Sequence, residues 1–207
     1  MRKNCTIFVI DDDESVRKAT SFLLQSEGYK VETFESAEKF LETEIHHCAG
    51  CIVLDIQMED MTGLELQEKL IKKRLEIPII FITGHGNIPI SVKAMKKGAY
   101  DFLTKPFNDE EFLSAVANAV EMSSNVLSAN KEKERIFEEM TNLTEREKEI
   151  LEYIIAGYMN KEISSKLNIA EPTVKIHRGN IMRKLCADSV VDLVRKAEKA
   201  DILPRKR

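Results

Sequence analysis

The sequence lacks an apolar run of the roughly 20 residues that a membrane-spanning helix requires. It also lacks a visible secretory signal, because residues 1–6 lead directly into a strand-like segment. Cysteine is scarce, with four in 207 residues, which without a secretory signal indicates a reducing compartment rather than a disulfide framework. We therefore expect a cytoplasmic protein that does not enter a membrane.

The composition is that of an ordinary soluble globular protein, with 43% hydrophobic and 32% charged residues. The length allows one large domain or two small ones. Charge is unevenly divided: residues 141–207 carry 14 Lys and Arg against 10 Asp and Glu, and the remaining residues carry 17 against 25. The acidic part suggests a cation as partner, and the basic part suggests nucleic acid.

A short apolar run, Cys51–Asp55, ends in a carboxylate. Its consecutive aliphatic residues predict a strand that is buried on both faces, as in a parallel sheet. Residues 56–63 follow, with a glycine and polar residues suited to a loop. A carboxylate at the C-terminal end of such a strand lies where open α/β folds bind their ligands. We therefore interpret Asp55 as a phosphate acceptor.

Strand-like and helix-like segments alternate through residues 5–122. We expect strands at 6–10, 31–34, 51–55, 78–83 and 99–104, and helices at 15–25, 37–41, 64–71, 88–97 and from 109 to about 122. This alternation predicts βαβ units and an α/β domain, a five-stranded parallel sheet with helices on both faces. We assign this domain to residues 1–122.

The ends of the expected strands carry four polar groups: Asp11 with Asp12, Asp55, Thr83 and Lys105. Clustered carboxylates repel one another unless a divalent cation lies among them, and Mg²⁺ prefers oxygen ligands. We expect Mg²⁺ to be held by three acids and a loop carbonyl, namely Asp11, Asp12, Asp55 and the backbone oxygen of Gln57. The ion would support in-line transfer of a phosphoryl group to Asp55.

Two further strand-end groups suit a phosphate. Lys105 is a point charge for one phosphate oxygen, and the Thr83 hydroxyl can donate a hydrogen bond to another. A cis peptide bond before Pro106 would orient the lysine. Each group alone is more often a surface residue, so the prediction depends on their occurring together at matching strand ends.

With these residues, the chain resembles a response-regulator receiver domain over residues 1–122, of the flavodoxin-like doubly wound kind. The acidic pair, the phosphorylated Asp, the Thr, the aromatic and the Lys-Pro pair are Asp11 and Asp12, Asp55, Thr83, Phe102 and Lys105-Pro106. The resemblance implies that a sensor histidine kinase phosphorylates Asp55. It also implies that Thr83 then moves toward the phosphate and Phe102 turns inward, which repacks the face of helix four, strand five and helix five. Residues 82–86 resemble the FixJ subgroup in particular.

An enzyme is the alternative interpretation of the same domain. Residues 11–16 also fit the Asp-x-Asp-x-Ser/Thr-Val pattern of the haloacid dehalogenases, in which the first acid, here Asp11, is the nucleophile and the second, here Asp13, is a general acid. That family needs another acidic pair at a late strand end, and here only Asp109–Glu111 follows Lys105, where it begins a helix. This reading also leaves Asp55 without a role.

Residues 123–142 are rich in Ser, Asn, Lys and Glu, which predicts a helical extension or a flexible linker. Residues 143–203 then read as four short helices. Thr144 and Glu147 form a capping box for the first, Gly157 ends it, and Pro172 opens the third. We assign residues 143–207 to a second, all-α domain.

A helix, a tight turn and a cationic next helix are typical of a helix-turn-helix. The helix at 173–185 would enter the major groove near its N-terminus. We expect base contacts from Thr173, Lys175, Ile176 and Gly179. We expect phosphate contacts from the cations Lys161, Lys166, Arg178, Arg183 and Lys184. On pattern alone, a basic protein–protein module is the alternative.

Three segments of this domain, residues 143–147, 160–163 and 173–177, resemble the LuxR/FixJ-type DNA-binding domain. The resemblance implies double-stranded promoter DNA as a partner and suggests that the fourth helix pairs two copies on DNA. Gly179 departs from the pattern, since a longer polar side chain is common there. Together the two resemblances imply a transcriptional regulator, not an enzyme, that becomes a homodimer on phosphorylation. A regulator that binds DNA independently of phosphorylation is the alternative.

Four residues fit neither resemblance: His46, His47, Cys48 and Cys51. Their types and the Cys-x-x-Cys spacing could bind Zn²⁺ or sense redox state. Against this, Cys51 begins a buried strand, where cysteine usually acts as a small apolar residue. Both interpretations stay open on sequence.

Overall fold

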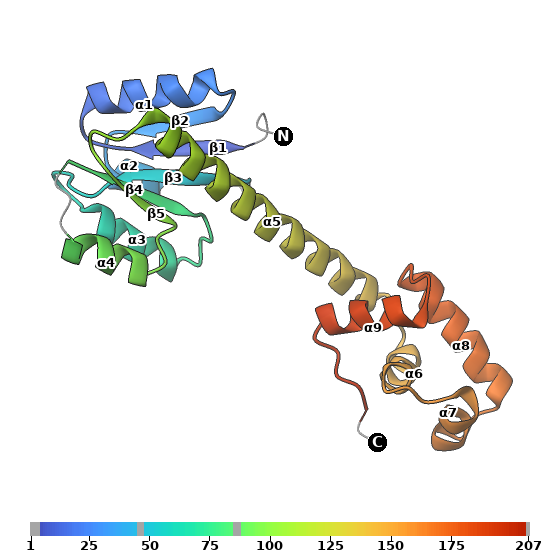
Figure 1. Cartoon of the computed structure of the whole chain (residues 1–207). Helices are drawn as coiled ribbons and strands as arrows, with labels where there is room; N and C mark the ends of the chain where they lie inside the picture. The colour runs from blue at the N-terminus through green and yellow to red at the C-terminus, as the bar shows by residue number, and fades with distance from the viewer. Residues whose placement is uncertain (1–4, 45–47, 85–87, 206–207) are drawn as a thin grey trace. The chain divides into compact units, whose positions relative to one another are not determined.

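The computed structural model describes residues 5–44, 48–84 and 88–205 (Figure 1). Contacts divide the chain into two compact units, Met1–Ser128 and Ala129–Arg207. Within the described ranges, no helix combines the length and the apolar character that a membrane crossing would need.

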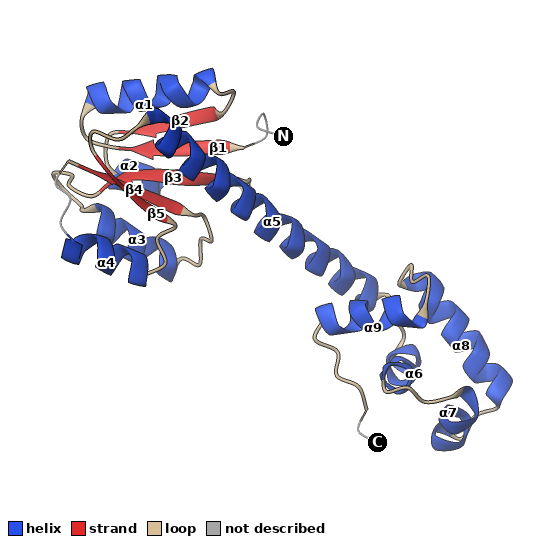
Figure 2. Ribbon diagram, in the orientation of Figure 1, coloured by secondary structure: helices blue, strands red, loops and turns tan. Residues whose placement is uncertain are grey.

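The first unit is built on a parallel sheet (Figure 2). Its strands are β1 (Thr6–Ile10), β2 (Lys30–Phe34), β3 (Gly50–Asp55), β4 (Ile79–Thr83) and β5 (Asp101–Thr104), in the order β2-β1-β3-β4-β5. Leu54 pairs with Ile10 on one side and with Phe81 on the other. The C-terminal strand ends therefore meet at one edge, and the predicted five-stranded parallel sheet is confirmed.

The helices of this unit are α1 (Glu14–Ser26), α2 (Ala37–Glu42), α3 (Gly63–Lys72), α4 (Ile88–Lys96) and α5 (Asp109–Thr141). Side chains of Asp13, Ser36 and Thr62 accept hydrogen bonds from backbone amides of the first turns of α1, α2 and α3. Most bounds agree with the sequence prediction within two residues. The peptide bond between Lys105 and Pro106 is cis, the possibility raised by the sequence.

Alternate residues of each strand face opposite layers of helices. Ile7 and Val9 pack with residues of α1 and α5, whereas Phe8 and Ile10 pack with residues of α2, α3 and α4. This two-sided burial explains the uninterrupted apolar runs of the sequence. Phe22, an apolar residue of α1, is 75% exposed and lies outside this core.

Helix α5 is much longer than predicted. The segment 123–142 was left open between a helical extension and a flexible linker, and it is helical through Thr141. No glycine or proline occurs between Asp109 and Thr141, so nothing in the backbone chemistry ends the helix earlier. The boundary between the two units falls inside this helix.

The second unit contains α6 (Glu145–Ile155), α7 (Asn160–Leu167), α8 (Glu171–Lys184) and α9 (Val190–Lys199). The predicted capping box of Thr144 and Glu147 begins α6, and Gly157 follows α6 with φ 82°. Asn168 ends α7 in the left-handed conformation. Ile136 and Met140, from the end of α5, join its apolar core. The four predicted helices are confirmed.

Candidate functional site

The edge where the strands end holds two buried carboxylates and a lysine. Nζ of Lys105 lies 2.7 Å from Oδ2 of Asp11 and 3.1 Å from Oδ1 of Asp55. Asp11 is 1% exposed and Asp55 5%. We call Asp11, Asp55 and Lys105 the carboxylate–lysine cluster. Three of the predicted site residues are thus brought together, from the segment after β1, the end of β3 and the segment after β5.

The electrostatics of the cluster follow from its burial. Desolvation raises the pKa of Asp55, and the nearby Asp11 adds to this, while Lys105 and the Gln57 amide only partly oppose it. Burial by itself would lower the pKa of Lys105, but hydrogen bonds to Asp11 and Asp55 raise it overall. A charged lysine therefore compensates two carboxylates that would otherwise repel each other.

Backbone and side-chain donors fix the carboxylates in place. The Gln57 amide donates to Oδ2 of Asp55 at 3.0 Å, and the Asp13 amide donates to Oδ1 of Asp11 at 2.9 Å. Arg17 donates to the backbone carbonyl of Asp11 at 2.6 Å. The sequence analysis did not predict a role for Arg17. The available signal was its position one turn into α1, after the acidic residues.

Thr83 and Phe102 lie on the two strands beyond Asp55. Thr83 ends β4, is 2% exposed, and follows Ile82, which pairs with Asp55. Phe102 lies on β5 beside Phe81, is half-buried, and packs against the core shared with α2, α3 and α4. Asp55 therefore lies beside the strand that ends in Thr83, and that strand lies beside the strand that carries Phe102.

The predicted set of metal ligands is only partly assembled. Asp12 is exposed, and among residues 5–44, 48–84 and 88–205 no three acidic, His or Cys side chains form a metal-binding group. Asp11 and Asp55 nevertheless offer hard oxygen ligands at one point, and Mg²⁺ commonly binds through one or two carboxylates while keeping its waters. The donors that are present fit Mg²⁺ in this restricted sense.

The geometry does not favour the dehalogenase interpretation. Oδ1 of Asp13, its expected general acid, accepts from the backbone amide of Ser15 at 2.8 Å and from that of Val16 at 3.3 Å. Asp13 is therefore the N-cap of α1. Asp11, which would be the nucleophile of a dehalogenase, forms an ion pair with Lys105 instead.

In the second unit, one side of α8 is exposed and partly cationic. Val174 and Ile181 are fully buried, whereas four residues on the other side are exposed, namely Lys175, Ile176, Gly179 and Arg183. Ile176 is 64% exposed. Thr173 is half-buried at the start of the helix. We call the four exposed residues the α8 face.

The remaining predicted cations have different surroundings. Lys161 and Lys166 are exposed on α7, with Nζ of Lys166 5.1 Å from the centre of the Tyr158 ring. Arg178 is half-buried, which lowers its pKa. Lys184 forms an ion pair within the unit: its Nζ is 2.7 Å from Oε2 of Glu147 and 3.1 Å from the Asn142 carbonyl. This ion pair favours a structural role for Lys184 over the phosphate contact that we predicted.

The histidine and cysteine hypothesis gains no support. His46 and His47 lie outside the described residues, Cys48 is half-buried, and Cys51 is fully buried. Desolvation raises the pKa of the Cys51 thiol well above its usual value, which disfavours the thiolate that metal binding and oxidation require. Cys51 therefore acts as a small apolar residue of β3.

Comparison with known families matches both parts of the chain. Residues 7–117 match the family described as "Response regulator receiver domain". Residues 141–197 match the family described as "Bacterial regulatory proteins, luxR family".

Relatives with both parts are similar along nearly the whole chain. The response regulator protein TodT of Pseudomonas putida is 44% identical over 93% of this chain and 85% of its own length. The transcriptional regulatory protein FixJ of Bradyrhizobium diazoefficiens is 36% identical over 95% of this chain and 96% of its own.

Solved structures agree with these relationships. The response regulator StyR superposes with a TM-score of 0.87 at 45% identity, covering 95% of this chain and 99% of that one. Full-length FixJ from B. japonicum superposes with a TM-score of 0.56 at 35% identity, covering 96% and 98%. The chain belongs to the FixJ-like two-component response regulators, transcriptional regulators in which a receiver domain is joined to a luxR-family DNA-binding domain.

Proposed function

We propose that a sensor histidine kinase transfers a phosphoryl group to Asp55 and that this switches promoter binding by the C-terminal unit. The observation that carries the proposal is the contact of buried Asp55 with Lys105 at the C-terminal edge of the sheet. A receiver domain implies a kinase partner, and a luxR-family domain implies binding to DNA. The receiver is the domain of residues 1–122, the linker is 123–142, and the DNA-binding domain is 143–207.

The chemistry at Asp55 is nucleophilic attack by a carboxylate oxygen on phosphorus, with the donor's oxygen or nitrogen leaving in line. Because Lys105 contacts both carboxylates, it is within reach of the oxygens that the incoming phosphoryl group would bring. The Gln57 amide holds Oδ2 of Asp55 and thereby orients the carboxylate. Burial keeps competing water away from the new acyl phosphate.

Receiver domains generally bind Mg²⁺ at the phosphorylation site. In this chain Asp11, Asp12, Asp55 and the backbone oxygen of Gln57 would hold the ion. When bound, Mg²⁺ supplies positive charge against the phosphoryl oxygens.

The switch would begin at Thr83, whose hydroxyl donates to the phosphoryl group. When Thr83 moves, it leaves a space beside β5. The ring of Phe102, on β5, can then turn further into the core. Phe102 packs against the layer that includes α4, so its rotation would repack the α4–β5–α5 face. Two receivers would pair through that face.

Pairing two chains raises the effective concentration of the second DNA-binding unit near the first. The α8 face would enter the major groove, with Lys175, Ile176 and Gly179 near base edges and Arg183 near phosphate. Thr173 would also contact a base edge. Lys161, Lys166 and Arg178 would contact the phosphate backbone. The fourth helix, α9, would pair the two copies on DNA.

The test is phosphorylation by a radiolabelled small phosphodonor with Mg²⁺, followed by dimerisation and DNA binding. Asp55→Asn should take up no label, stay monomeric and bind the promoter less tightly than the phosphorylated parent. Asp60→Asn, an exposed acid in the adjacent loop, is the matched control and should behave as the parent. Stoichiometric labelling of Asp55→Asn would refute the acceptor assignment. Equal DNA binding with and without label would favour regulation that is independent of phosphorylation.

A further inference from the structure

The last turns of α5 belong to the second unit, where they lie against α9 (Figure 1). Ile136 is 1% exposed and Met140 is 6% exposed, and both pack in the apolar core that α6, α7, α8 and α9 share. An ion pair at the rim of this contact joins Lys133 to Asp201 at 3.0 Å, and both side chains are more than half exposed. Exposed ion pairs contribute little to stability, so apolar packing is the main contact that fixes α5 here.

A more deeply buried cation lies in the same contact. The Lys196 side chain, on α9, is 12% exposed. Its ammonium donates to the backbone carbonyl of Leu185 and, at 3.1 Å, to that of Cys186. These two residues form the turn directly after α8, and a positive charge is favoured at the C-terminal end of a helix. Lys196 therefore caps the end of α8.

The same ammonium faces a carboxylate of α5. Nζ of Lys196 is 3.6 Å from Oε2 of Glu139, whose side chain is 18% exposed. That oxygen is buried and has no hydrogen-bond partner among the described residues. The other carboxylate oxygen lies 3.7 Å from Nε of Arg135, one turn earlier in α5. A buried carboxylate is costly without a cation, so Lys196 balances the charge of Glu139 from another helix.

Lys196 thus joins three helices, because it extends from α9, caps α8 and pairs with α5. The end of α8 cannot move away from α5 without separating the pair with Glu139 or uncovering the two carbonyls. Lys184 and Glu147 hold the same end of α8 to α6. Together the two ion pairs fix the C-terminal end of α8, and with it the direction in which the α8 face projects.

We infer that Lys196 is a positioning residue for DNA binding, which holds α8 against the last turns of α5 through the carboxylate of Glu139. The inference rests on the proposed contact of the α8 face with DNA. The ammonium of Lys196 is directed at the carbonyls and at Glu139 rather than at solvent, so it is not itself a phosphate contact. Helix α5 begins in the receiver unit, and Lys196 would make the position of α8 depend on that helix.

The first test replaces Lys196 by methionine, a side chain of similar length without a charge. Binding of the full-length protein to promoter and scrambled duplexes is measured by fluorescence anisotropy, at a temperature where circular dichroism shows each variant to be folded. Lys196→Met should bind the promoter about tenfold more weakly, within the range of coupling between packed elements, and the scrambled duplex nearly as tightly as the parent does. The carbonyl chemical shifts of Leu185 and Cys186 should change as well, because their hydrogen bonds to the ammonium are lost.

A merely structural role predicts a different result. Loss of folded protein would lower the affinity for both duplexes by the same factor, whereas a displaced α8 weakens the contacts that depend on register with base edges. Lys133→Met removes an exposed ion pair between α5 and the residue that follows α9, and this matched control should bind both duplexes as the parent does. Unchanged promoter affinity in Lys196→Met, or an equal loss on both duplexes, would overturn the inference.

Glu139→Gln tests the link to α5. This variant keeps Lys196 but removes the charge that pairs with it, so promoter affinity should fall. The double variant should bind no more weakly than Lys196→Met alone, because the two residues act as a unit, and simple addition of the two losses would refute the link to α5. Lys175→Ala separates these outcomes from failure of the proposed function. If that variant binds both duplexes as the parent does, the α8 face does not contact DNA, whereas a loss in Lys175→Ala with none in Lys196→Met refutes the positioning role alone.

Discussion

The ammonium of Lys184 lies 2.7 Å from Oε2 of Glu147, joining the end of α8 to the beginning of α6. Glu147 is 3% exposed and also caps α6 through Thr144. Its burial would raise the pKa of the carboxyl, but Lys184 and the Thr144 hydrogen bonds lower it overall. The helix that carries the proposed DNA contacts is thus held to its neighbour by an ion pair whose carboxylate is buried.

Replacing Lys184 should therefore destabilise the second unit rather than weaken a phosphate contact. Lys184→Met leaves a buried carboxylate without its cation, which costs about 3 kcal/mol. Lys161→Met, at an exposed position of α7, should change stability by less than about 0.5 kcal/mol. Amide hydrogen exchange along α8 in the full-length protein measures both. Equal protection in the two variants, with a shallower salt dependence of DNA binding for Lys184→Met, would restore the phosphate-contact interpretation.

The contrast between Lys184 and Lys105 shows what the sequence could reveal. Lys105 was predictable because parallel strands end at one edge, so residues at matching strand ends converge without knowledge of the packing. Lys184 is one cation among several on a helix, and its partner lies 37 positions away on another helix. Only the packing of α6 against α8 decides which cation turns inward.

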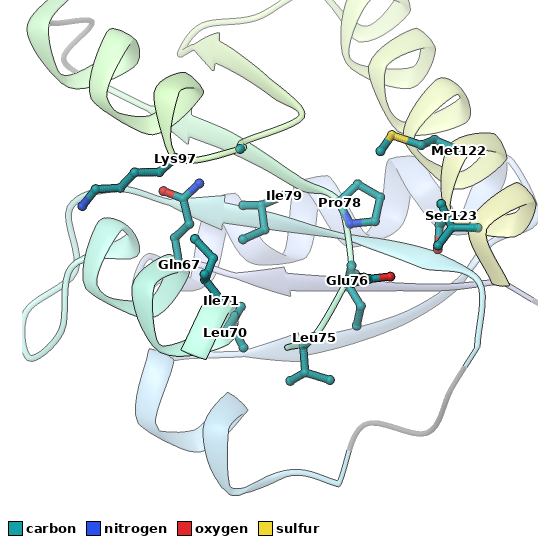
Figure 3. A pocket seen from close by; sticks show the side chains of 13 residues that line it. Gln67, Leu70, Ile71, Leu75, Glu76, Pro78, Ile79, Lys97, Met122 and Ser123 are labelled. Atoms are coloured by element: carbon teal, nitrogen blue, oxygen red, sulfur yellow. The ribbon is translucent and has the colours of Figure 1, made fainter. Parts of the chain in front are cut away.

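The length of α5 and the hydrogen bonding of Gln67, on α3 (Figure 3), were unpredictable for related reasons. The polar composition of residues 123–142 is compatible with an exposed helix or with coil, because neither buries a continuous apolar face. The buried side-chain amide of Gln67 donates to the carbonyl of Ala94, which is 27 residues further along the chain. Local pattern cannot report such distant contacts.

The raised pKa of Asp55 predicts a pH-dependent stability difference for Asp55→Asn. Burial holds the pKa of the Asp55 carboxyl above its usual value in the folded state, so the folded parent must ionise a buried group, and its stability falls as the pH rises through that folded pKa. The asparagine variant does not titrate. Urea unfolding of the receiver without Mg²⁺ should show that the free energy of unfolding of the variant rises relative to that of the parent as the pH increases from 4 to 7. A difference that shrinks over this range would mean that Lys105 outweighs burial.

Base contacts and phosphate contacts should respond differently to alanine. Lys175→Ala, on the α8 face, should reduce the ratio of specific to non-specific DNA affinity, because a base contact contributes about 1–3 kcal/mol of discrimination. Lys166→Ala, on α7, should weaken binding to all sequences alike and lower the salt slope by about one. Fluorescence anisotropy with promoter and scrambled duplexes at several salt concentrations separates the two. An equal loss on both duplexes for Lys175→Ala would reassign it to phosphate.

Gly179 provides a further test of how closely α8 approaches DNA. A methyl group added at this position meets no atom within 4 Å in the protein, and glycine within an exposed helix costs about 1 kcal/mol relative to alanine. Gly179→Ala should therefore stabilise α8 by about 1 kcal/mol, seen as slower amide hydrogen exchange. If the backbone at Gly179 lies against a base edge, the same variant should lose promoter affinity despite its greater stability. Stabilisation with unchanged promoter affinity would instead place Gly179 away from the bases and confine readout to Lys175, Ile176 and Thr173.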